Sequence, residues 1–547
     1  MICLLPLTLL VGSIGTTTSA PTQDTELELG VRKLVQRWSG EDTPGGAICV
    51  LRDGEPIVLE TFGMADLDAG TPITETTPFY IASTAKTITA LCATLAANDH
   101  KLDLDASVLK TFPELPDSVS AATLRQAMSH TSGLVDVYDA AIVADLPIET
   151  ISSNANALEF LAQIPAPHFT PGSRLVYSNS GYMLLAEAIE RGTGMDLADY
   201  AQEHVFDAFG MQHAYYLGEQ PSAGQATSYR QSGTGWQSFE IKTGLRGPGG
   251  VFASMQDMIH FDRGLRSGLA PELRSALFTP LANADHPSWG RYAAGWMIQT
   301  MGGLRVQRHP GGAFGFQADM LRFPDEDVTV IVLANAADIS AMDLSEAVAR
   351  LTLTDEMEAA APAPLEAVPL SRTEQQRFGR LWRSPTTGEI WFLSPRETGA
   401  VVYALGDMSL ALTPVSKSRL EAPESQVPFA VELDGEQLVI SIDERELARL
   451  EALPFPPKDL APTEEYEGEY GSDDLACSII LEALPDGRLR LRQENAFIDI
   501  PPFTAFGKDL YLCDKGAQID FHRDDSGTVI GLTMHGKRAW GLEFVRY

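Results

Sequence analysis

Ser83 and Lys86 stand three residues apart, directly before an apolar run at residues 88–97 that predicts a helix. Residues three apart on a helix share one face, so the lysine amine lies beside the serine hydroxyl. A serine becomes an effective nucleophile only when a base is within hydrogen-bond reach. The N–H groups and positive dipole of a helix N-terminus favour a lysine with a lowered pKa and a developing oxyanion. The pair therefore predicts nucleophilic attack by Ser83.

A second Ser-x-x-Lys pair, Ser107 and Lys110, shows that this spacing is weak by itself. Pro113 and Pro116 follow it, and proline disfavours a helix. We interpret Ser107 as a chance match, because only Ser83 is followed by a long apolar helix.

Tyr177-Ser178-Asn179 is the one Tyr-x-Asn in the chain. A phenol near a lysine ammonium can share its proton and act as general base toward serine. The Asn179 amide can hold the lysine and a substrate carbonyl. Taken alone, these residues are better explained by a buried tyrosine at a turn.

The third element is His309-Pro310-Gly311-Gly312, which we expect on a strand beside a Gly-rich turn. Glycines on a strand let a substrate backbone approach closely. The N–H of Gly312 can then form an oxyanion hole with that of Ser83. A tight turn with an incidental histidine is the alternative. Lys242-Thr243-Gly244 precedes the last strands and is in the wrong place for this element.

The elements that must position these residues belong to one α/β domain, residues 25–354. A helix at 26–38 and a hairpin of strands at 47–52 and 56–61 precede Ser83, so the serine lies against one end of a sheet. Four further strands and a closing helix come late in the domain, at 294–299, 305–309, 317–322, 328–334 and 341–351. The sheet is therefore expected to join the two ends of the domain.

Residues 355–370 have the composition of a linker. Short alternating runs with turn signals follow and predict antiparallel β structure. Two stretches open alike, with aromatic residues four apart at Phe378 and Trp382 and at Tyr466 and Tyr470. We predict two β-barrel domains related by duplication, at 371–454 and 462–547. One larger β domain is the alternative.

The formal net charge of −34 argues against nucleic-acid binding, which needs Lys and Arg on phosphates, and against docking on anionic lipid. Solubility alone is the plainer explanation of this charge. Residues 1–20 have the apolar run of a signal peptide and are too short to span a membrane. We therefore expect export to the periplasm or medium, with an unprocessed apolar tail as the alternative. No later stretch predicts a membrane span.

The cysteine and histidine spacing predicts no metal site, since it contains no C-x-x-C and no His/Cys cluster. Cys477 and Cys513 share the C-terminal region, and the sequence leaves open whether they pair after export.

Ser-x-x-Lys, Tyr-x-Asn and His-x-Gly occur in this order, each in suitable local structure. The conjunction resembles the serine β-lactamase and penicillin-recognising hydrolase family, especially its class C and esterase-like branch. The resemblance implies an α/β (α+β) β-lactamase/transpeptidase-like catalytic domain that needs no cofactor. It also implies that Ser83 is acylated and that Lys86 and Tyr177 activate it. Asn179 is then a supporting residue of the site, and His309 lines it.

Two C-terminal β-barrels and His-x-Gly in place of Lys-Thr-Gly resemble the D-aminopeptidases of this family. Without that lysine the site lacks a cation for a substrate carboxylate, which favours amine-ended peptides, amides or esters. In those enzymes a long loop of the last barrel reaches the site. Here the hairpin at 513–518 is a short turn, so we expect a more open entrance, with Asp514 as the candidate contact to a substrate amine.

The sequence thus predicts a serine hydrolase that acts through an acyl-enzyme on small peptides, amides or esters. A D-aminopeptidase-like activity that releases N-terminal D-residues is placed first. The alternatives are an esterase, a D,D-carboxypeptidase or β-lactamase-like hydrolase, and a non-catalytic binding protein of the same fold. An α/β-hydrolase is disfavoured because no Gly-x-Ser-x-Gly occurs. The sequence does not decide whether the protein forms a homodimer.

Overall fold

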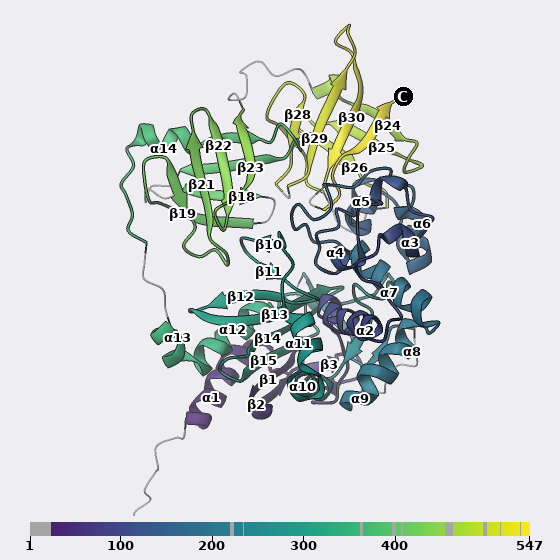
Figure 1. Cartoon of the computed structure of the whole chain (residues 1–547), viewed down its shortest axis with the longest axis vertical. Helices are drawn as coiled ribbons and strands as arrows, with labels where there is room; N and C mark the ends of the chain where they lie inside the picture. Colours follow the sequence, from purple (N-terminus) through teal and green to yellow (C-terminus); the bar gives the residue numbers. More distant parts are fainter. Residues whose placement is uncertain are drawn as a thin grey trace, which may run out of the picture.

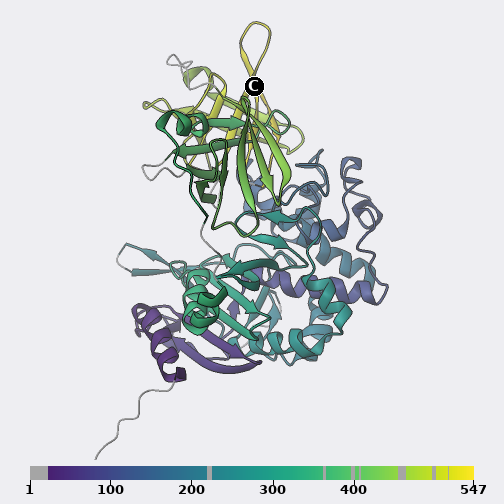
Figure 2. The same cartoon turned by 60° about the vertical axis from the view of Figure 1, so that its left-hand side comes forward.

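A computed structural model describes residues 23–218, 224–233, 235–360, 365–395, 401–405, 408–453, 463–495, 500–514, 516–536 and 538–547. The expected signal peptide, residues 1–20, lies outside these ranges. In both views the two β domains lie together at one end of the molecule, and the N-terminal helix α1 lies at the other (Figure 1, Figure 2). Among the described helices, none is long and apolar enough to cross a bilayer.

The core of the catalytic domain is an antiparallel sheet in the order β10-β11-β12-β13-β14-β15-β1-β2. Strand β1, the first in the chain, pairs with β15, the last, and Ile48 lies opposite Val332. This pairing confirms that the sheet joins the two ends of the domain. The strands are β1 (Gly46–Arg52), β2 (Glu55–Phe62), β10 (Asp285–His286), β11 (Gly290–Tyr292), β12 (Met297–Met301), β13 (Leu304–Ala313), β14 (Phe316–Phe323) and β15 (Val328–Ala334).

Side chains of these strands alternate between two apolar clusters, as the period of two requires. Ile48 and Val50 face α1 (Gln23–Val35) and α12 (Ala341–Thr352), whereas Cys49 faces the opposite cluster, which contains α2. The remaining helices of the domain are α2 (Lys86–Asn98), α3 (Val108–Thr111), α4 (Leu124–Met128), α5 (Val137–Val143), α6 (Asn154–Leu161), α7 (Asn179–Thr193), α8 (Leu197–Ala201), α9 (Asp207–Phe209), α10 (Met255–Arg263) and α11 (Pro271–Phe278).

Short strands complete the catalytic domain. They are β3 (Met64–Asp66), β4 (Thr71–Pro72), β5 (Phe79–Tyr80), β6 (Tyr215–Tyr216), β7 (Ser228–Ser232), β8 (Gly235–Phe239) and β9 (Val251–Ala253). Strand β5 matters for the site. It pairs with β9 and leads directly into the 3-10 turn Ala82–Ala85, which carries Ser83.

The C-terminal part contains two separate β domains, as the sequence predicts. The first is a closed barrel of β16 (Leu381–Arg383), β17 (Ile390–Pro395), β18 (Val401–Leu405), β19 (Met408–Pro414), β20 (Arg419–Glu421), β21 (Phe429–Asp434), β22 (Gln437–Ile442) and β23 (Arg445–Ala452). The second is an eight-stranded sheet of β24 (Gly468–Ser472), β25 (Cys477–Ala483), β26 (Leu489–Arg492), β27 (Thr504–Ala505), β28 (Leu510–Leu512), β29 (Gln518–Arg523), β30 (Val529–His535) and β31 (Leu542–Arg546).

The two β domains share an opening that supports duplication. Trp382 Nε1 donates to the Phe378 carbonyl at 3.0 Å, and Tyr470 Oη donates to the Tyr466 carbonyl at 2.8 Å. All four side chains are buried. The first strand of each domain also pairs with its second and its last strand. These features argue against one larger β domain.

Two expectations about local structure are corrected, and one question that the sequence leaves open is answered. Helix α13 (Thr354–Ala360) occupies the start of the expected linker, because Met357 is buried against the catalytic domain. Ser107 begins the short helix α3 despite the prolines: its hydroxyl accepts the Leu109 N–H, and Lys110 pairs with Asp103 at the surface. The pair of Cys477 and Cys513 is not formed, since the Cys477 thiol is free.

Each β domain docks on a different part of the catalytic domain. The first contacts the β10–β11 edge, where Arg445 pairs with Asp285 at 3.0 Å. The second contacts α5 and the residues after it: Asp145 accepts the N–H groups of Glu494 at 2.8 Å and Asn495 at 3.2 Å. The second domain is therefore placed beside α5, next to the predicted site.

Candidate active site

Ser83 lies on the 3-10 turn Ala82–Ala85, directly before α2. Ala82 has a φ of 46°, a strained conformation of the kind found at functional sites. Strand β13 crosses this turn closely: a Cβ on Gly311 would lie 2.2 Å from the Ile81 carbonyl oxygen and 2.9 Å from the Thr84 nitrogen. Gly311 is thus required for the approach of β13 to the Ser83 turn.

A cavity of about 1040 Å³ opens over Ser83. Six of the predicted site residues line it, namely Ser83, Tyr177, Asn179, His309, Gly311 and Gly312. Lys86 lies fully buried beneath them. The structure therefore brings together seven of the eight residues that the sequence singles out.

Lys86 Nζ lies 3.2 Å from Ser83 Oγ, 2.9 Å from Asn179 Oδ1 and 2.7 Å from the Pro248 carbonyl oxygen. Burial holds the pKa of Lys86 well below its usual 10.5. Two of the three neighbours, Asn179 Oδ1 and the Pro248 carbonyl, can only accept. A neutral amine would give its two N–H groups to them, so its lone pair faces the Ser83 hydroxyl.

Tyr177 closes the other side of Ser83. The centroid of its ring lies 4.8 Å from Lys86 Nζ, and Tyr177 and Ser83 line the same cavity. Burial raises the pKa of Tyr177, so the phenol keeps its proton while the neighbouring ammonium is disfavoured. The two pKa shifts therefore agree: in the resting site Lys86 is a neutral amine and Tyr177 is a neutral phenol.

Asp136 is a buried carboxylate that the sequence analysis missed. Its Oδ2 accepts the Asn179 backbone N–H at 2.6 Å and Asn179 Nδ2 at 2.9 Å. Its Oδ1 accepts the N–H groups of Tyr138 and Asp139, so it also caps α5. Because Nδ2 points to Asp136, the amide oxygen of Asn179 faces Lys86. The signal in the sequence was an aspartate directly before an apolar helical run.

Asp136→Asn is expected to lower kcat/KM by about 10²-fold, because a misoriented Asn179 displaces Lys86 from Ser83. The Asp136 charge raises the pKa of Lys86. Its loss lowers that pKa, so the acidic limb of the kcat/KM profile should move to lower pH. A pH–rate profile measures both effects, with the surface ion-pair variant Asp105→Asn as control. A loss of activity with an unmoved limb would contradict this electrostatic role.

His309 is neutral in this site. Its Nδ1 lies 2.7 Å from the Pro310 carbonyl oxygen, which can only accept, so Nδ1 carries the proton. Its Nε2, 2.8 Å from Tyr292 Oη, then accepts from that phenol. Burial and the charge of Lys86 lower the pKa of His309 to about 3. The Gly-rich turn expected after it is absent, because Gly311 and Gly312 continue strand β13.

His130 is a second residue to which the sequence analysis gave no role. Its ring packs 4.2 Å from that of Tyr177, between centroids, and its Nδ1 accepts the Ser178 N–H at 3.0 Å. Burial holds the pKa of His130 well below 6.5. This histidine therefore supports Tyr177 as an uncharged packing partner.

Asp514 does not line the cavity. It is exposed on the tight turn between β28 and β29, where the Cys513 N–H donates to the Ala517 carbonyl at 2.9 Å. The neighbouring Gln518 donates its side-chain N–H to the Gly388 carbonyl of the first barrel at 3.2 Å. The structure therefore does not place Asp514 at the expected contact to a substrate amine, because this side chain is exposed and lies outside the cavity lining.

The cavity is lined instead by two other carboxylates, Asp139 and Glu240, and by Arg538 of the second β domain. Arg538 lies on the connection between β30 and β31, not on the hairpin at 513–518. The expectation that the last domain leaves the entrance open is thus corrected: it reaches the cavity through a different loop.

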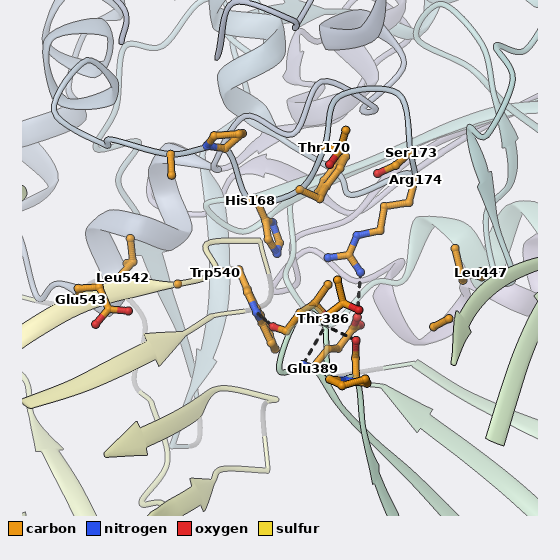
Figure 3. A pocket seen from close by; sticks show the side chains of 18 of the residues that line it. His168, Thr170, Ser173, Arg174, Thr386, Glu389, Leu447, Trp540, Leu542 and Glu543 are labelled. Atoms are coloured by element: carbon orange, nitrogen blue, oxygen red, sulfur yellow. Dashed lines mark hydrogen bonds and ion pairs between the residues drawn. The ribbon is translucent and has the colours of Figure 1, made fainter. Parts of the chain in front are cut away.

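A second hollow, of about 920 Å³, lies where the three domains meet (Figure 3). It contains the ion pair of Arg174 with Glu389, at 2.8 Å, and His168 stacked on Trp540. None of the predicted site residues lines it. Within the described residues, no group of three or more His, Cys, Asp or Glu side chains is arranged to hold a metal ion.

Comparison with known proteins matches residues 31–353 to the family described as Beta-lactamase. A D-aminopeptidase of Brucella anthropi is 25% identical over 540 residues, which cover 95% of this chain and 98% of the relative. The octameric penicillin-binding protein homologue from Pyrococcus abyssi superposes with a TM-score of 0.54 at 19% identity, over 78% of this chain and 99% of that one. A D-amino acid amidase from Ochrobactrum anthropi, complexed with D-phenylalanine, gives 0.52 at 20% identity, over 60% and 99%.

Proposed function

Because the chain belongs to the β-lactamase family and is a serine hydrolase, we propose that it hydrolyses the amide bond after an N-terminal D-residue through an acyl-enzyme on Ser83. The observation that carries this proposal is the contact of Lys86 Nζ with Ser83 Oγ at 3.2 Å inside a cavity that admits a small peptide. Neither residue needs a cofactor for this chemistry.

Acylation follows from the resting geometry. Ser83 Oγ attacks the carbonyl carbon and passes its proton to the neutral amine of Lys86. The Ser83 and Gly312 N–H groups are proposed to stabilise the oxyanion that forms. The phenol of Tyr177, which lines the cavity with Ser83, is proposed to protonate the leaving nitrogen. The C–N bond then breaks, and the amine product leaves.

Deacylation reverses these roles. A water molecule occupies the place of the leaving amine and loses a proton to the Tyr177–Lys86 pair as it attacks the acyl carbon. The tetrahedral intermediate collapses, Ser83 recovers its proton, and the D-residue is released. The neutral state of His309 means that it provides shape and a hydrogen bond here, but no charge.

The substrate class is supported by the relatives whose names denote D-aminopeptidases and match nearly the whole chain. It is also supported by negative charge in the cavity wall, to which the carboxylates Asp139 and Glu240 contribute and which favours a substrate ammonium group. Export through residues 1–20 is part of the same proposal, on the strength of their apolar run.

A substrate panel tests the proposal. We expect the wild type to hydrolyse D-alanine p-nitroanilide at least about tenfold faster than its L-enantiomer, and faster than nitrocefin, which has no free amine. Equal turnover of both enantiomers would contradict the preference for D-residues. A preference for p-nitrophenyl acetate with no anilide hydrolysis would replace the D-aminopeptidase assignment by an esterase. Faster turnover of nitrocefin would favour a β-lactamase-like activity.

A further inference from the structure

The second β domain inserts one arginine into the active-site cavity. Arg538 lies between β30 and β31, and its backbone is fixed to the first turn of α5 at two points. Its carbonyl accepts the Asp136 N–H at 3.0 Å, and its own N–H donates to Asp139 Oδ2 at 2.6 Å. Asp136 in turn orients Asn179, so the loop is attached to the same carboxylate that organises the site.

Packing around this loop holds it in place. A Cβ on Gly536 would lie 3.0 Å from both Asp139 Oδ2 and Val143 Cγ2, so the loop lies directly on α5. On its other side Trp540 stacks on His168, with ring centroids 5.8 Å apart, and its Nε1 donates to the Thr387 carbonyl of the first barrel at 2.8 Å (Figure 3). All three domains therefore contact the segment that carries Arg538.

The guanidinium of Arg538 lies over the Tyr177 ring, 5.1 Å from its centroid, and lines the same cavity as Ser83. Tyr177 faces the leaving group in the proposed mechanism, so this cation lies on the leaving-group side. Two other cations of the described part line the cavity, Arg230 and Lys242, and both are solvent-exposed. His309 cannot serve as a cation, because its pKa of about 3 keeps it neutral.

We propose that Arg538 binds the carboxylate of the leaving group, so that the preferred substrates are short D-aminoacyl peptides whose leaving amine is an amino acid with a free carboxylate. A planar guanidinium matches a carboxylate with two parallel hydrogen bonds. This inference rests on the proposed function and specifies its leaving-group side. It reverses the expectation that a site without the Lys-Thr-Gly lysine has no cation for such a group.

D-Ala-Gly and D-Ala-glycinamide differ only in this carboxylate, and they provide the test. Each peptide competes with a fluorophosphonate for Ser83, which measures binding even without turnover, and kcat/KM is measured in parallel. The wild type should prefer D-Ala-Gly by about 10–100-fold, the range of a hydrogen bond to a charged group. Arg538→Gln should remove this preference, so that the ratio of the two peptides falls to about one whatever change in turnover they share.

Arg538→Glu tests the sign of the interaction. It should reverse the preference and favour the monoamide of D-alanine with ethylenediamine, whose leaving group is cationic. Arg546→Gln is the matched control, because Arg546 also lies over a tyrosine, Tyr470, in the same domain and away from the cavity. Fluorophosphonate labelling of each variant at Ser83, with its thermal melt, shows that the site is folded.

Two outcomes would overturn the inference: a wild type that does not distinguish the acid from the amide, or a preference that persists in Arg538→Gln. An equal loss for both peptides would also overturn it, since that result indicates a structural role. Failure of the proposed function is distinct, because the wild type would then hydrolyse neither peptide, and neither peptide would compete with the fluorophosphonate for Ser83.

Discussion

Ser83→Ala is expected to lower kcat on D-alanine p-nitroanilide by at least about 10⁴-fold, because the variant has no atom that can form the acyl-enzyme. The cavity and its hydrogen-bond donors remain, so substrate binding should change little. Stopped-flow absorbance measures the release of p-nitroaniline, and direct binding of the substrate to the variant gives Kd.

Ser107→Ala is the matched control, since Ser107 also precedes a lysine by three residues. Its hydroxyl accepts the Leu109 N–H at 3.2 Å and donates to the Ser120 carbonyl at 2.7 Å. We therefore expect a loss of about 1 kcal/mol of stability through the lost helix cap, and unchanged kcat. Equal turnover by Ser83→Ala and the wild type would remove Ser83 from the mechanism.

Lys86→Ala is expected to lower kcat/KM by about 10²–10⁴-fold, the usual contribution of a positioned base. In the wild type the pKa of Lys86 is lowered by burial. Protonation removes the lone pair that faces Ser83, so kcat/KM should fall as the pH falls through this lowered pKa. That limb should lie well below pH 10.5, and it should be absent from the residual activity of the variant.

Lys86→Arg separates a base from a cation at this position. Arginine keeps the positive charge but is not deprotonated in proteins, so the variant should be about as inactive as Lys86→Ala. Lys110→Ala, at the exposed pair with Asp103, should leave the pH profile unchanged. An active Lys86→Arg with an unshifted acidic limb would show that Lys86 acts only through its charge.

The sequence was sufficient for the residues whose motifs are local. Ser83 and Lys86 share one helical turn, and Tyr177 and Asn179 lie within three residues, so spacing alone predicts their joint position. The sequence also singled out Gly311, and the structure gives the physical reason for a glycine there: any side chain would collide with the Ser83 turn. The joining of the two domain ends in one sheet also followed from the sequence, because strand patterns occur at both ends of the domain.

The residues that the sequence analysis missed act over long separations. Asp136 reaches Asn179 through a buried carboxylate, and Arg538 reaches Tyr177 from another domain. No periodicity or spacing in a single chain relates such pairs, because the contact depends on how the second β domain docks on α5. The mistaken choice of Asp514 has the same origin: its charge was visible in the sequence, but its position outside the cavity lining was not.

The central claim, covalent catalysis by Ser83, is tested most directly by trapping the acyl-enzyme. Wild-type protein is mixed with D-alanine p-nitroanilide, quenched in acid within the first turnover, and digested for mass spectrometry. We predict a D-alanyl adduct on the peptide that contains Ser83, and none in Ser83→Ala. An adduct on another residue, or full turnover by Ser83→Ala, would contradict the mechanism.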